Sequence, residues 1–179
     1  MADVSTLFWN REQQRPRALW RLLLQGLLLL AAALALGAVV GIALTTWQAV
    51  RPGLVPTAAV LGLPVASAVV MLLATVGSVW LAGRALDHRR FADFGFHLDR
   101  AWWLDLGFGL ALGALLMAGI FAVERTAGWV AVRGLCWVPP AGPPFVLGML
   151  AALWMFVAVG IYEELLVRGY RLLNLTEGL

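Results

Sequence analysis

Two adjacent carboxylates, Glu163 and Glu164, end a long apolar run and are followed by Arg168. Carboxylates beside apolar sequence are costly unless they are paired, hydrated or at an interface. Because residues four apart share a helix face, Glu164 and Arg168 are expected to pair. Glu163 lies about 100° further round the helix and keeps a free carboxylate. A free carboxylate can accept a proton from water, which indicates hydrolysis. An ion-paired helix end at the membrane surface is the alternative that spacing alone leaves open.

An α-helix through this region also predicts which residues accompany Glu163. Gly160, one turn earlier, leaves room for water, a substrate or a neighbouring helix. Arg171 extends the face of Glu164 and Arg168. The face expected for Glu163 carries Phe156, Gly160, Val167, Tyr170 and Asn174.

The composition identifies the environment of this helix. The chain has 179 residues, of which 62% are hydrophobic and 13% charged. Soluble domains carry roughly 25% charged residues, so this chain is too apolar for a water-exposed surface. Disorder, a collagen-like repeat and a disulfide-rich secreted module are excluded. The single cysteine, Cys136, has no partner for an internal disulfide and lies in no metal-ligand spacing.

The fold class predicted by the apolar runs is an all-α polytopic membrane protein with about four transmembrane helices. About 20 residues are enough to cross the hydrocarbon core. Residues 1–17 form a polar N-terminal segment, and residues 18–179 form one membrane domain. The expected spans cover residues of about 19–46, 54–82, 104–123 and 145–174.

Arginine positions predict the orientation. They are more numerous before the first span and in the loop between the second and third spans than in the first and third loops. Basic residues favour the cytoplasmic side, so the N-terminus is expected in the cytoplasm. We therefore expect a multi-pass protein of the cell membrane, in a bacterium the inner membrane, with lipid as a partner. The net charge of +3 is explained by orientation, and no nucleic-acid partner is expected.

A resemblance to a known family rests on Glu163–Tyr170, which reads Glu-Glu-x-x-x-Arg-Gly-Tyr after a Pro-rich turn. This string resembles the first motif of the CAAX-processing and bacteriocin-processing (CPBP, abortive-infection) intramembrane metalloproteases. Arg171–Leu175 is similar to the continuation of that motif, and Asp87–Phe96 is weakly similar to a cytoplasmic loop of the family. Only residues 163 to 175 are specific.

The resemblance implies an intramembrane endopeptidase of the CAAX-processing type. Its substrate would be a membrane-associated or lipidated peptide or protein. Glu163 matches the family glutamate that activates the attacking water, and Glu164 and Arg168 match the rest of the catalytic motif. The family also carries two later motifs with histidines, which bind or polarise the water, in many descriptions with zinc.

The sequence departs from this pattern after Arg168, where it contains no histidine. The two histidines, His88 and His97, lie in the second loop, nine residues apart, and are expected to be solvated. No cofactor or metal site is therefore expected within this chain, and zinc would belong to a complete family member.

Two interpretations follow from this departure. We expect the N-terminal part of a larger protease domain, truncated or inactive alone. A non-catalytic membrane scaffold or immunity-type protein is the alternative. A transporter ranks last, because the charges lie at a helix end and the chain shows no inverted repeat.

Overall fold

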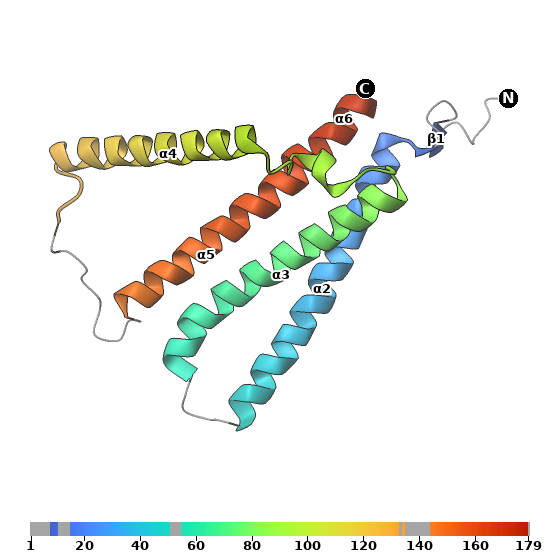
Figure 1. Cartoon of the computed structure of the whole chain (residues 1–179). Coiled ribbons are helices and arrows are strands. Elements are labelled where there is room, and N and C mark those ends of the chain that lie inside the picture. The colour runs from blue at the N-terminus through green and yellow to red at the C-terminus, as the bar shows by residue number, and fades with distance from the viewer. Residues whose placement is uncertain (1–7, 11–14, 51–54, 133, 135–143, 179) are drawn as a thin grey trace. The chain divides into compact units, whose positions relative to one another are not determined.

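The structure is a computed structural model that describes residues 8–10, 15–50, 55–132, 134 and 144–178 (Figure 1). Cys136 and most of the Pro-rich turn lie outside the described residues. The long helices are α2 (Ala18–Val50), α3 (Val55–Ala85), α4 (Arg100–Thr126) and α5 (Phe145–Glu163). Helix α5 continues without a break into the π-helix η2 (Glu164–Leu172) and the short helix α6 (Leu173–Gly178).

Among the described residues, four helical stretches are long and apolar enough to cross a membrane: Ala18–Val50, Gly62–Ala85, Arg100–Thr126 and Phe145–Gly178. This confirms the predicted all-α fold class with about four candidate spans. Each of these stretches continues a few residues past the predicted end of its span. The prediction stopped near charged residues such as Arg84, whereas long basic side chains can extend from a helix end towards water.

Three short elements of the described chain, two strands and one 3₁₀ turn, lie outside the long helices. Strand β1 (Trp9–Asn10) pairs antiparallel with β2 (Arg15–Pro16) just before α2. The ring of Phe8 stacks on Trp20 of α2 with centroids 4.7 Å apart, so this part of the N-terminal segment folds back on the first helix. The 3₁₀ turn η1 (Phe91–Phe94) follows α3.

The chain divides into two compact units, Phe96–Phe145 and the remainder. Helix α4 forms most of the Phe96–Phe145 unit and buries none of its side chains. Its first turn is capped by Asp99, whose carboxylate accepts a hydrogen bond from the backbone N–H of Trp102 at 2.8 Å. An apolar helix with no buried face suits a lipid environment or a packing partner.

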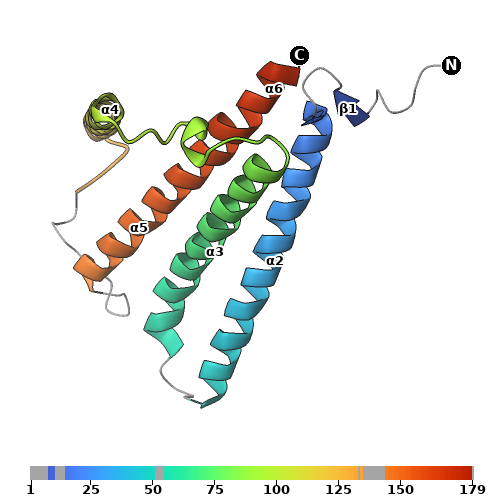
Figure 2. The same ribbon diagram turned by 45° about the vertical axis from the view of Figure 1, so that its right-hand side comes forward.

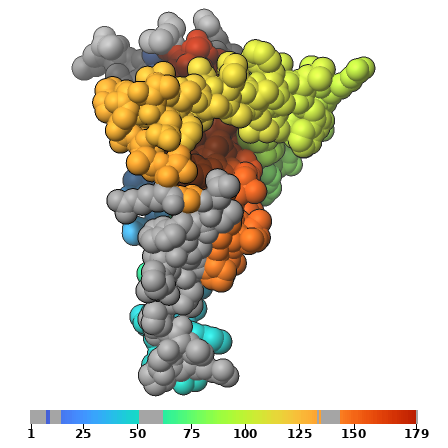
Figure 3. Space-filling model, turned by 90° about the vertical axis from the view of Figure 1, so that its left-hand side faces the viewer, coloured from blue at the N-terminus to red at the C-terminus, as the bar shows by residue number. Residues whose placement is uncertain are grey.

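In the other unit, α3 lies between α2 and α5 (Figures 1 and 2). Much of α5 is exposed, and its side chains lie at the surface in the face shown in Figure 3. The buried residues collect where the start of α2, the end of α3, η1, η2 and α6 meet. The apolar side chains buried there include Val79, Ala82, Phe94, Leu165 and Tyr170.

Candidate functional site

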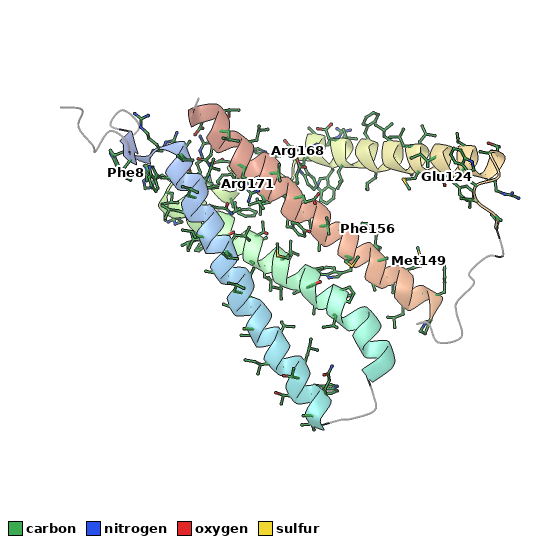
Figure 4. All side chains as sticks on the ribbon, turned by 180° about the vertical axis from the view of Figure 1, so that it is seen from behind. Phe8, Glu124, Met149, Phe156, Arg168 and Arg171 are labelled. Carbon is green, nitrogen blue, oxygen red and sulfur yellow. The ribbon has the colours of Figure 1, made fainter. Side chains whose placement is uncertain are left out.

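The carboxylate motif, defined here as Glu163, Glu164 and Arg168, lies where an α-helix becomes a π-helix. Glu163 is the last residue of α5, and Glu164 is the first of η2. Figure 4 shows Phe156, Arg168 and Arg171 along this continuous helix. In a π-helix each backbone bond spans one more residue than in an α-helix, and such segments are frequent at functional sites.

The pairing predicted for Glu164 is confirmed. Its Oε2 lies 3.3 Å from Nη1 of Arg168, in an i,i+4 ion pair. The two side chains are 50% and 74% exposed, so water weakens the attraction between them. Glu163 is also exposed, and within the described chain its carboxylate takes part in no ion pair or hydrogen bond. The motif thus presents one paired and one unpaired carboxylate side by side.

The face predicted for Glu163 is wrong in its C-terminal half. Phe156 and Val167 are exposed, as Glu163 is, but Tyr170 and Asn174 are buried at 0% and 1% exposure. The prediction used the rotation per residue of an α-helix, whereas η2 is wider and places more residues in each turn. Residues beyond Glu164 therefore shift round the helix, and the segment gains separate exposed and buried sides.

Gly169, on the buried side, permits a close approach of the loop after α3. A Cβ at Gly169 would lie 2.6 Å from the carbonyl oxygen of Phe94, so a side chain does not fit there. The ring of Phe94 also lies against Gly83 of α3, where an added Cβ would be 2.6 Å from its Cε2. The rings of Phe94 and Tyr170 are 5.6 Å apart. Phe94 is thereby held between two glycines and fixes η1 against η2.

A cluster of charges joins the same elements further along, and we call it the ion-pair cluster. Arg21 of α2 forms a buried ion pair with Asp87, which follows α3. Glu177 of α6 accepts a hydrogen bond from Arg15 at 2.9 Å and another from Arg89. The cluster ties the start of α2, the loop after α3 and the C-terminal turn of the motif helix together.

The sequence did not predict this cluster. Its arginine pattern presents Arg21 only as an orienting charge, and Asp87 only as part of a weakly similar loop. One feature of the sequence could have indicated a buried polar contact. Arg21 and Gln25 lie four residues apart at the edge of an apolar helix, so they share one helix face. The partner across the chain is long-range, and spacing within one helix does not identify it.

The described residues do not supply a zinc site. Among them, no three His, Cys, Asp or Glu side chains come together as a group that could hold a metal ion. His88 and His97 are both exposed in the loop region after α3, as the sequence predicted. Neither lies on the helix that carries Glu163.

Comparisons with protein-family models, curated proteins and solved structures found no match for this chain. Its function is therefore inferred from its residues and their geometry.

Proposed function

We propose that this chain carries the general base of an intramembrane endopeptidase of the CAAX-processing type, with Glu163 as that base. The observation that carries the proposal is an exposed carboxylate, unpaired within the described chain, beside a second carboxylate that is neutralised by Arg168. The alternative, an ion-paired helix end, accounts for the Glu164–Arg168 pair but not for the second carboxylate on Glu163. The location of the motif at an α-to-π transition, a feature frequent at functional sites, adds support.

In the proposed reaction, the Glu163 carboxylate takes a proton from a water molecule, whose oxygen attacks the scissile carbonyl carbon. The carbon–nitrogen bond then breaks, and the proton passes to the leaving amine. Glu164 and Arg168 neutralise each other and leave Glu163 as the reactive charge. The histidines that the resemblance implies would come from a segment other than the loop that carries His88 and His97.

The four candidate spans are compatible with a multi-pass membrane protein. We propose the bacterial inner membrane, with the N-terminus in the cytoplasm, as its location. The exposed apolar helices would then contact lipid, and the substrate would be a membrane-associated or lipidated peptide or protein. Glu163, at the end of an apolar helix, would meet a substrate that approaches from the membrane.

The test compares cleavage by the natural gene product and by its Glu163→Gln variant. Membranes that contain each protein are incubated, and new protein N-termini are identified by mass spectrometry, which detects cleavage of any membrane protein present. Glu124→Gln makes the same chemical change at the far end of α4 and serves as the matched control. We expect new N-termini with the natural protein and with Glu124→Gln, and none with Glu163→Gln.

Cleavage that persists in a folded Glu163→Gln variant would remove Glu163 from the catalytic role. If membranes with the natural protein give no N-termini beyond those of membranes that lack it, the protease proposal fails. A non-catalytic membrane scaffold or immunity-type protein would then be the better interpretation.

A further inference from the structure

Helix α2 is apolar along its length, yet the side chains that it buries are polar. Of its residues only Arg21 and Gln25 are buried, whereas many of its leucines are exposed. Two other helical segments repeat this arrangement with polar residues three or four positions apart, which places each pair on one face. The polar core, as we name it, consists of Arg21, Gln25, Thr75, Ser78, Asp87, Tyr170 and Asn174.

Contacts between the helices bring these faces together. Arg21 pairs with Asp87, and the Gln25 amide donates a hydrogen bond of 3.3 Å to the Ser78 hydroxyl. The hydroxyl of Tyr170 lies near the Asp87 carboxylate, at the margin of hydrogen-bond geometry. A polar contact of this kind is commonly bridged by a water molecule.

Many polar atoms of the polar core have no hydrogen-bond partner in the part of the chain that the structure describes. Six buried side-chain atoms have no hydrogen-bond partner within the described chain: Arg21 Nε, Gln25 Oε1, Thr75 Oγ1, Asp87 Oδ2, Tyr170 OH and Asn174 Oδ1. Buried polar groups in proteins are almost always hydrogen-bonded, to protein or to ordered water. Lipid offers no donor or acceptor in their place.

The chemistry of these atoms identifies the ligand that fits them. They include donors on Arg21, Thr75 and Tyr170 and acceptors on Gln25, Asp87 and Asn174. The charges of Arg21 and Asp87 balance each other, so a charged ligand would leave a net charge buried. Water is neutral, and each molecule both donates and accepts.

We propose that the polar core binds a chain of ordered water molecules between α2, α3 and η2–α6. The chain starts at the Arg21–Asp87 pair and ends at Thr75. Thr75 lies ten residues before the end of α3 at Ala85, which is about 15 Å along a helix. The water would therefore extend about 15 Å along α3 from its charged end. This inference concerns the buried side of the motif helix and does not depend on the proposed hydrolysis.

The test is radiolytic hydroxyl-radical footprinting of the full chain in lipid nanodiscs, read out by mass spectrometry. Water bound next to a buried side chain produces radicals in place and labels that side chain. Tyr170 and Phe94 are neighbouring aromatic residues with 0% and 2% exposure. We expect labelling of Tyr170 several-fold above that of Phe94. Opening of the bundle would label both.

A second measurement tests how deep the water extends. Thr75→Val removes the buried hydroxyl at the far end of the chain and keeps the shape of the side chain. Thr46→Val is the matched control, because the Thr46 hydroxyl is exposed and donates to the backbone carbonyl of Ile42 at 2.8 Å. We expect Thr75→Val to lower the labelling of Tyr170 several-fold, and Thr46→Val to leave it unchanged.

Two results would overturn the proposal. One is labelling of Tyr170 no faster than Phe94 in the unchanged protein. The other is Tyr170 labelling that Thr75→Val leaves unchanged, and a higher melting temperature of that variant would point to the same conclusion. Removal of a hydroxyl that truly lacked a partner would stabilise the fold, whereas removal of one bonded to water would not.

Discussion

The two sides of the Glu163–Asn174 segment differ in the environment of their charged and polar groups. On the exposed side, Glu164 and Arg168 pair in water, and Glu163 is left without a partner within the described chain. On the buried side, Tyr170 lies near the Arg21–Asp87 pair, Asn174 bonds to the Tyr170 carbonyl, and Gly169 admits the backbone of Phe94. The exposed charges contribute little to stability and can serve chemistry, whereas the buried groups hold the motif helix against α2 and α3.

Loss of the buried Arg21–Asp87 pair should lower the free energy of unfolding more than loss of the exposed Glu164–Arg168 pair. A buried ion pair gains little over apolar residues of the same size, but loss of one partner leaves a buried charge without its closest counter-ion. An exposed pair loses almost nothing when broken, because water solvates both groups. Substitutions on the two sides should therefore differ strongly in their effect on the free energy of unfolding.

The largest effect is expected from Asp87→Ala. It leaves the Arg21 guanidinium buried at 1% exposure and removes its closest carboxylate, which should cost about 3–5 kcal/mol of unfolding free energy. Denaturation in detergent micelles, followed by tryptophan fluorescence, measures the loss. A double variant, Arg21→Met with Asp87→Leu, is the control and should recover most of it, because no charge is left unpaired.

A cost for Asp87→Ala no greater than that of a change on the exposed side would contradict the comparison. Such a result would mean that an ion pair with Glu177, or hydration, replaces the interaction of Arg21 with Asp87 at little cost. The distance of 3.8 Å between Arg21 Nη1 and Glu177 Oε2 makes Glu177 the nearest replacement.

The next largest loss of stability is expected from Gly169→Ala. The added Cβ meets the Phe94 carbonyl oxygen at 2.6 Å, and a backbone atom cannot move aside as a flexible side chain can. Overpacking of this kind costs about 1–3 kcal/mol. The matched control is Gly160→Ala on the same helix, where nothing lies within 4 Å of the added Cβ. Thermal unfolding of both variants in the same detergent measures the effect, and we expect a lower melting temperature for Gly169→Ala alone. An equal decrease in both variants would show that the loss of a helix glycine, rather than the contact with Phe94, is responsible.

Much of the fold follows from local sequence. The apolar runs predicted four candidate spans with ends within a few residues, because hydropathy and length are properties of each segment alone. The Glu164–Arg168 pair was predictable for the same reason, since both partners lie within one turn. The contacts made by the glycines were not predictable in this way. The contacts of Gly83 and Gly169 depend on Phe94, which comes from a separate turn, so neither helix reveals them.

The buried side of the site required information that spacing does not contain. The π-helix changed which residues accompany Glu163, whereas the prediction assumed the rotation per residue of an α-helix. Asp87 reaches Arg21 across 66 positions of sequence. Local patterns therefore predicted the exposed side of the motif well and the buried side poorly.

The smallest effect is expected from Glu164→Gln, which breaks the exposed pair with Arg168. Pairs of this exposure contribute about 0.2–1 kcal/mol, and salt screens them. A double-mutant cycle with Arg168→Gln, measured by denaturation at low and high salt, isolates the pair from other effects. We expect a small coupling that fades at high salt. A coupling as large as the cost of Asp87→Ala would mean that the exposed side also holds the fold, and the distinction that leaves Glu163 available for chemistry would then fail.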